Sequence, residues 1–314
     1  MISLDIIRIF ACFSVVMVHA SIMFNIPGRL GRFMEAGSNG LGIFYILSGF
    51  LIFMTLDKEH VDLKKWYIKR LIRILPIYYT VVIFYIIFYE GIVRMVPEDT
   101  MGLKWISYFL CINTIVGNDV VFWYNLGALS SMSVFVWFYL LAPMMKKIIT
   151  NWNQSALFFV FSYVLLRLLQ YTQWFRMFRA YYYIAIGIWV YYSIKEHKEK
   201  LTSILFLCVM LLIQLAGGEG GLLYALTIAV IMMNSYNVSV DNDRAGAIIR
   251  FLSDRTFAIY LAHTVAIQII DQISIENVAI KVIMFYGITI IGIIILHEIV
   301  ERYTVRLYNR LKRA

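Results

Sequence analysis

The sequence predicts an all-α protein, a polytopic transmembrane helix bundle of about ten spans with both termini in the cytoplasm. Three observations support this fold class. Hydrophobic residues make up 61% of the 314 residues, the mean hydropathy is +0.77, and only 15% of the residues are charged. Apolar runs long enough to cross a bilayer recur from one end of the chain to the other. No stretch is long enough for a separate soluble domain, so we expect residues 1–314 to form a single integral-membrane domain.

The apolar runs give the positions of the expected spans, each bounded by polar or basic residues. The ten predicted spans are residues 4–24, 39–56, 74–93, 124–145, 154–172, 178–194, 201–216, 222–236, 256–272 and 278–299. The first run is not expected to be a cleavable signal peptide, because it lacks a basic leader and carries Asp5 and Arg8 where an apolar core should begin.

The distribution of basic residues predicts the orientation. With the N-terminus inside, 19 lysines and arginines fall in the inner loops and the C-terminal tail, and six fall in the outer loops. The positive-inside rule favours this arrangement, so we interpret the net charge of +9 as topological and do not expect a nucleic-acid partner. Counting Trp105–Val116 as a span would place Lys146 and Lys147 outside. We therefore expect this short run to be a re-entrant or interfacial segment on the outer side.

Arg8 and His19 are two ionisable residues inside the first apolar run. In a helix, eleven residues bring the two side chains within about 20° of one stripe and about 16 Å apart along the axis. Charged groups at membrane depth usually face a cavity, a partner or a reaction pathway. The alternative is that Arg8 snorkels to the near interface and that His19 is a packing residue. Their shared stripe favours a site, with Asp5 as the expected salt-bridge partner of Arg8.

No metal site is expected. Cys12, Cys111 and Cys208 lie far apart, with no CxxC pair and no cluster of cysteine and histidine, so they indicate neither a disulfide framework nor a zinc site.

Several motifs, in order along the chain, carry a resemblance to one family. They are the Leu4-Asp5 pair, Arg8 with His19 eleven residues later, the glycine-led Gly40–Phe50 run ending in Ser-Gly-Phe, the basic Tyr67–Tyr78 segment, Trp123-Tyr124, Tyr139–Pro143, and Phe257–His263 with its Tyr-Leu-Ala-His end. Together they resemble the acyltransferase-3 family of bacterial integral-membrane O-acyltransferases, which acylate surface polysaccharides. The resemblance spans nearly the whole chain.

Two departures narrow the resemblance. Many members carry an acidic residue where this chain has Phe135, and the family's Glu-Arg-Pro pattern in the last span appears here as Glu301-Arg302-Tyr303. The first departure argues against the subgroup that acetylates lipopolysaccharide and peptidoglycan. It suits the shorter, stand-alone subgroup associated with exopolysaccharide.

The resemblance implies a reaction and its partners. We expect acetyl-CoA as the acyl donor, a polysaccharide or glycan hydroxyl as the acceptor, and membrane lipids as the surroundings, in the bacterial cytoplasmic membrane. Lys69, Arg70 and Arg73 are the candidate donor-binding residues, since guanidinium forks suit phosphate oxygens and the family's basic pair is implicated in acyl-CoA use. The alternative for these three is an ordinary inner basic loop that binds anionic lipid.

The candidate catalytic residues are His19 and Arg8. His19 is the expected base, because a neutral imidazole is available near neutral pH; it deprotonates the acceptor hydroxyl or carries the acyl group. Arg8 is expected to orient the donor or to stabilise negative charge at the thioester. The further candidates for the cavity or the substrate are Asp5, Ser48, Trp123, Tyr124, Arg167 and His263.

Each of these further candidates except Asp5 has a structural alternative. Ser48 can bond to its own helix, Arg167 can snorkel, and His263 can bond to a neighbouring helix. Trp123 and Tyr124 can belong to an aromatic belt. In contrast, we expect His297, Glu298 and Glu301 to be interfacial, at the inner end of the last span.

Two other functions fit the same composition. A transporter or exporter of a glycan or lipid-linked sugar would also have many spans and buried ionisable residues, although no inverted repeat is visible in this sequence. A non-catalytic subunit of a polysaccharide assembly complex is the third possibility.

Overall fold

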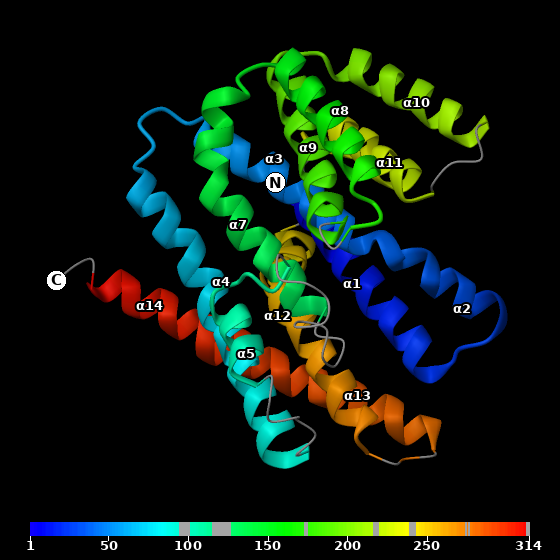
Figure 1. Cartoon of the computed structure of the whole chain (residues 1–314), viewed down its shortest axis with the longest axis vertical. Helices are drawn as coiled ribbons and strands as arrows, with labels where there is room; N and C mark the ends of the chain where they lie inside the picture. Colours follow the sequence, from blue (N-terminus) through cyan, green and yellow to red (C-terminus); the bar gives the residue numbers. More distant parts are fainter. Residues whose placement is uncertain are drawn as a thin grey trace. The chain divides into compact units, whose positions relative to one another are not determined.

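The computed structural model describes residues 1–93, 101–114, 127–172, 175–215, 220–238, 243–273, 275 and 277–311. Throughout these ranges the regular structure is helical, which confirms the predicted all-α class (Figure 1). The helices are α1 (Ile2–Phe24), α2 (Gly28–Glu35), η1 (Ala36–Asn39), α3 (Gly40–Leu56), α4 (Leu63–Ile86), η2 (Ile87–Val93), α5 (Met101–Phe109), α7 (Gly127–Ile148), α8 (Trp152–Leu168), α9 (Phe175–Lys195), α10 (Glu199–Leu215), α11 (Gly220–Ser235), α12 (Asp243–Asp271), α13 (Val278–Ile293), η4 (Ile294–Glu301) and α14 (Arg302–Leu311). Both η2 and η4 are π-helical.

Within the described ranges, five helical stretches are long and apolar enough to cross a membrane. They are Ile2–Phe24, Gly28–Leu56, Leu63–Tyr89, Ala128–Ile148 and Val278–Arg310, and the shorter apolar helix is Gly220–Ser235. The chain is therefore a multi-pass membrane protein. The count of ten spans and the cytoplasmic termini stay predictions.

Short polar segments end one helix and begin the next. Asn25 adopts a left-handed conformation with φ 48° and ends α1, as asparagine commonly does at a helix C-terminus. Asp62, Asn151 and Asn277 precede α4, α8 and α13, and the side chain of each accepts a hydrogen bond from a backbone N–H of the first turn. These caps explain why helices begin within a chain that is mostly apolar.

The described chain divides into two compact units. The first unit comprises Met1–Val61 and Leu141–Asp254, and the second comprises Asp62–Leu140 and Arg255–Ala314.

In the first unit, α3 and α9 lie side by side at glycines (Figure 1). A Cβ atom at Gly49 of α3 would collide with the backbone carbonyl of Ile184, and one at Gly187 of α9 would collide with that of Ile46. Small residues that let two backbones approach closely are the usual basis of helix packing in membranes. The glycine of the Ser-Gly-Phe motif is therefore a packing residue.

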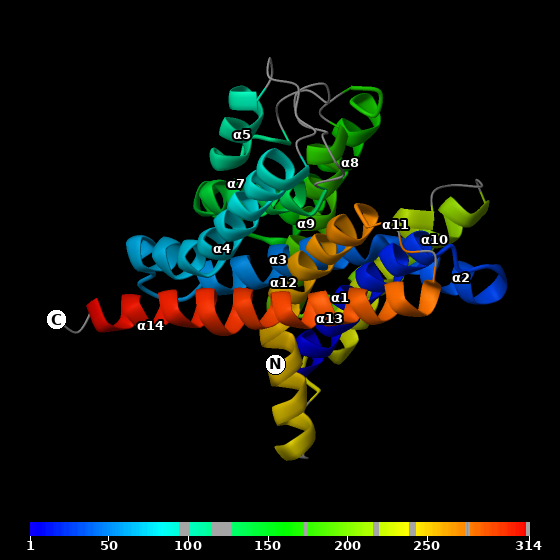
Figure 2. The same ribbon diagram turned by 90° about the horizontal axis from the view of Figure 1, so that it is seen from below.

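In the second unit, α13, η4 and α14 follow one another as a continuous helical rod (Figure 2). The helix α4 packs against both η4 and α14 of this rod. The nine-residue α5, which covers part of the run expected to be re-entrant, also contacts α4. Residues 115 and 116 of that run lie outside the described residues.

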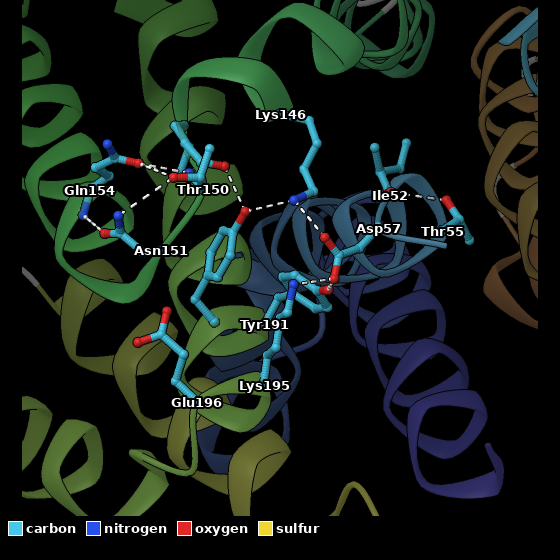
Figure 3. A network of polar contacts seen from close by, with 12 residues as sticks. Ile52, Thr55, Asp57, Lys146, Thr150, Asn151, Gln154, Tyr191, Lys195 and Glu196 are labelled. Carbon is cyan, nitrogen blue, oxygen red and sulfur yellow. Dashed lines mark hydrogen bonds and ion pairs between the residues drawn. The ribbon is translucent and has the colours of Figure 1, made fainter. Parts of the chain in front are cut away.

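An ion-pair cluster joins three helix ends in the first unit. Asp57, directly after α3, accepts hydrogen bonds from Lys195 and Tyr191 of α9, and Nζ of Lys146 at the end of α7 lies 2.7 Å from its Oδ1 (Figure 3). Burial by itself raises the pKa of Asp57, but the hydrogen bonds from Lys146, Lys195 and Tyr191 outweigh it and lower that pKa to about 2. We call Asp57, Lys146, Tyr191 and Lys195 the Asp57 cluster.

Candidate functional site

Arg8 is held in place by two partners in the first unit. Its Nη1 lies 3.2 Å from Oδ1 of Asp5, one turn earlier on α1, and donates a hydrogen bond of 2.9 Å to Oγ of Ser253 on α12. Ser253 in turn donates a hydrogen bond of 2.7 Å to Asp5. The expected pairing of Asp5 with Arg8 is present, and Ser253 closes it into a triangle. A half-buried guanidinium with this many contacts has a defined direction.

His19 lies on the same helix as Arg8. Helix α1 is α-helical from Ile2 to Phe24, so the two residues share one stripe as the sequence predicts. His19 is exposed, whereas Arg8 is half-buried. The imidazole is therefore the accessible group of the pair, and the guanidinium is the fixed one.

The three basic candidates lie near the N-terminal end of α4, in the second unit. Lys69 and Arg73 are exposed and Arg70 is half-buried. The Arg70 guanidinium carbon lies 3.9 Å from the centroid of the Trp66 ring, a cation–π arrangement that holds this side chain against its own helix. The three residues together place strong positive charge on one accessible helix end, as an anionic ligand requires.

Arg73 also contacts Glu301, one of the residues expected to be interfacial. Its Nε lies 3.9 Å from Oε1 of Glu301, and Oε2 of Glu301 is 2.9 Å from Nδ1 of His297. Both residues belong to the π-helix η4, and His297 is buried. The four-residue spacing of His297 and Glu301 is visible in the sequence, but it is also the spacing of an ordinary surface pair. The side chain of His297 is buried among its protein neighbours. Its expected place at the membrane interface stays a prediction.

Glu298 forms a second network, which meets the first at His297. It accepts hydrogen bonds from Arg255 on α12 and from Arg302 on α14, and its Oε1 lies 3.8 Å from Nε2 of His297. Glu298 therefore joins α12 to the rod, whereas Glu301 joins α4 to it.

His263 is completely buried in α12 of the second unit. Its Nδ1 lies 3.1 Å from the carbonyl oxygen of Ile259 on the same helix. Around it, α12 carries a row of buried polar side chains bonded to other elements. The pairs are Tyr260 with Ser131, Thr264 with Tyr85, and Gln268 with Tyr89. His263 thus lies in a polar layer inside the protein, where hydrogen bonds among side chains hold α4, α7 and α12 together.

The remaining candidates lie on other helices or outside the described residues. Ser48 is half-buried on α3, directly before the packing residue Gly49, and Arg167 is exposed in the last turn of α8. Trp123 and Tyr124 lie outside the described residues. Among the described residues, the structure joins Asp5 and Arg8 with Ser253 in the first unit, and it joins Arg73 with Glu301 and His297 in the second.

One protein family model, described as an acyltransferase domain of the acyltransferase-3 type, matches residues 1–298 of the 314. A search of curated proteins and a search of solved structures found no match. The matched region contains α1 with Arg8 and His19, the basic end of α4, and the row around His263. The chain therefore belongs to the acyltransferase-3 family and is a membrane acyltransferase.

Proposed function

We propose that this membrane acyltransferase transfers an acyl group from acyl-CoA in the cytosol to a hydroxyl of an envelope or extracellular polysaccharide. The proposed acyl group is acetyl. The proposed location of the protein is the bacterial cytoplasmic membrane. The observation that carries the proposal is helix α1. It presents an exposed imidazole at His19 and, on the same stripe, a guanidinium at Arg8 that Asp5 and Ser253 hold in a defined direction.

The donor is proposed to bind through its phosphates to Lys69, Arg70 and Arg73. An acyl-CoA carries several phosphate oxygens at the end remote from the thioester, and a guanidinium fork matches them with two parallel hydrogen bonds. Arg70 is held over Trp66 and Arg73 approaches Glu301, so neither cation is an unrestrained surface side chain. In the predicted topology this end of α4 faces the cytosol, where acyl-CoA is found.

The acceptor is proposed to be activated by His19. The imidazole takes the proton of the hydroxyl, the hydroxyl oxygen bonds to the acyl carbon, and the carbon–sulfur bond breaks, with CoA leaving as the thiol after it gains a proton. A neutral imidazole is suited to this step near neutral pH. The exposure of His19 supports the role, because a base must reach a substrate that arrives from outside the protein.

Arg8 is proposed to stabilise negative charge on the acyl carbonyl oxygen or to orient the donor. A cation contributes most when it is already in place before the charge develops, because no reorganisation is then needed. The triangle with Asp5 and Ser253 supplies this preorganisation.

The test is binding of CoA to the full-length protein in detergent micelles, measured by isothermal titration calorimetry. We expect saturable binding that weakens about tenfold or more in Arg70→Ala, because a charge-assisted contact to phosphate is lost. Lys147→Ala is the matched control, since Lys147 is a basic residue in the last turn of another helix, α7. Absence of CoA binding to the wild-type protein would contradict the proposed donor.

The competing functions separate in cells. If the purified protein does not bind CoA and its deletion stops export of a polymer without changing acylation, the transporter function is the better description. If the purified protein does not bind CoA, and acylation in cells is lost on deleting other assembly proteins as well as on deleting this one, the protein is a non-catalytic subunit.

A further inference from the structure

The contact between Arg73 and Glu301 has an unequal pattern of exposure. The Arg73 side chain is 67% exposed, that of Glu301 is 12% exposed and that of His297 is 8% exposed. A single line of contacts therefore runs from a buried imidazole, through a nearly buried carboxylate, to a guanidinium in solvent. An exposed arginine without such a contact would sample many rotamers. The contact with Glu301 therefore restricts the position of the Arg73 guanidinium.

The chemistry of the contact leaves Arg73 able to bind a ligand. Glu301 approaches the guanidinium at Nε, whereas Nη1 and Nη2 form the terminal fork that suits a phosphate group. The other oxygen of Glu301 is engaged by Nδ1 of His297 at 2.9 Å, so the carboxylate is itself fixed. All three residues belong to the second unit.

The local backbone is also unusual here. His297 and Glu301 lie in the π-helix η4, which joins α13 to α14 within the rod. π-helical turns are rare, and they are frequently found at functional sites because they redirect side chains that an α-helix would place elsewhere. Glu298 lies in the same π-helix but accepts hydrogen bonds from Arg255 and Arg302. The two carboxylates of η4 therefore contact different arginines.

From this arrangement we propose that Glu301 is a positioning residue for the acyl donor, which acts by orienting Arg73, and that His297 fixes Glu301. The inference rests on the proposed function, in which Arg73 binds the donor's phosphates. A guanidinium oriented in advance loses less side-chain freedom when the ligand binds, and affinity rises accordingly. Glu301 and His297 need no contact with the donor for this effect.

The test is a double-mutant cycle on CoA binding, measured by calorimetry on the full-length protein in detergent micelles. Glu301→Gln is expected to weaken CoA binding about three- to tenfold, which is the cost of ordering one more long side chain. In an Arg73→Ala background the same substitution is expected to leave the Kd within about twofold, because Glu301 acts only through Arg73. Equal losses in both backgrounds overturn the inference.

Glu298→Gln is the matched control, because it removes the other carboxylate of the same π-helix, whose hydrogen-bonded partners are Arg255 and Arg302. Glu298 also lies 3.8 Å from His297, but at Nε2, whereas Glu301 contacts Nδ1. It is expected to leave the CoA affinity within twofold of wild type. Two substitutions of His297 test the buried end. His297→Asn keeps an N–H donor near the place of Nδ1 and is expected to retain the affinity, whereas His297→Leu is expected to lose as much as Glu301→Gln. These variants also keep the test decisive if Glu301→Gln does not fold.

The outcomes for this inference and for the proposed function are distinguishable. A wild-type protein that does not bind CoA overturns both. A wild-type protein that binds CoA, with Glu301→Gln folded and binding equally well, overturns the positioning role alone.

Discussion

Ser253 donates a hydrogen bond of 2.7 Å to Asp5 and accepts one of 2.9 Å from Arg8, so a hydroxyl on α12 fixes an ion pair on α1. Among the described residues, the other recorded partner of Arg8 is Asp5, a neighbour on its own helix. The proposed role of Arg8 depends on the direction of its guanidinium, and three substitutions separate charge from orientation.

Arg8→Lys keeps the charge but replaces the planar fork by a point charge, and we expect acyl transfer to fall about 100-fold. Ser253→Ala keeps the whole guanidinium and loses one contact, so we expect a smaller fall, about three- to tenfold. Ser3→Ala is the control, because Ser3 is a buried serine of α1 that donates to the carbonyl oxygen of Tyr236 and not to this triangle. Transfer of radiolabelled acetyl into cell-surface glycan measures all three. Equal activity in Ser253→Ala and wild type would show that the triangle is only structural.

His19 gives the sharpest prediction for catalysis. We expect His19→Ala to lower acyl transfer by at least about 100-fold, the usual contribution of a general base, while the abundance of the protein in the membrane stays unchanged. We expect activity to fall without loss of protein, because His19 is exposed and substitutions of exposed residues usually change stability little. His197→Asn is the control, since His197 is also exposed and asparagine tolerates its φ of 55°. Glycan acetylation beside an immunoblot of the membrane fraction gives both quantities. If glycan acetylation persisted in His19→Ala, His19 would not be the catalytic base.

The Asp57 cluster predicts a stability difference that depends on pH. The carboxylate has a pKa of about 2 in the folded protein, below the value of roughly 3.9 expected in the unfolded chain. Its stabilising contribution is therefore fully present above about pH 4 and is lost as the pH falls through 2. We expect Asp57→Asn to cost about 2 kcal/mol at pH 7 and progressively less below pH 4, when unfolding of the micelle-solubilised protein is followed by intrinsic fluorescence.

Asp62→Asn is the control for this measurement. The side chain of Asp62 accepts a hydrogen bond from the backbone of Lys65, and it belongs to no contact of the Asp57 cluster. Asparagine is also a good helix cap, so little stability should be lost at any pH. A difference between Asp57→Asn and wild type that is constant from pH 7 to pH 3 would show that the cluster does not act through the charge of Asp57.

The sequence allowed prediction of those features that depend on residues close to one another along the chain. Apolar runs located the helices, because a membrane helix needs a continuous apolar stretch. The pairing of Asp5 with Arg8 was visible as a spacing of three on one helix. Ser253 was not predictable, since it follows Arg8 by 245 residues, and nothing in the sequence indicates which of many serines approaches α1.

The same limit explains the other residues that sequence reasoning missed. Asp57 precedes Tyr191 by 134 residues and Lys195 by 138, so its cluster exists only once α3 and α9 are packed. The link from Arg73 to Glu301 likewise needs α4 to lie against η4. A π-helix adds a further difficulty, because the expected side-chain directions assume 3.6 residues per turn.

Glycine packing between α3 and α9 yields the last prediction. Gly49→Ala places a methyl group against the backbone carbonyl of Ile184, which cannot rotate away as a side chain would, so the helices must separate. We expect a loss of about 1–3 kcal/mol, the usual cost of overpacking, and a lower melting temperature in detergent. Gly287→Ala is the control, because a Cβ atom at Gly287 of α13 meets nothing within 4 Å, and alanine favours a helix over glycine. Equal melting temperatures for the two variants would mean that α3 and α9 are not in close contact, and the Ser-Gly-Phe motif would then need a reason other than packing.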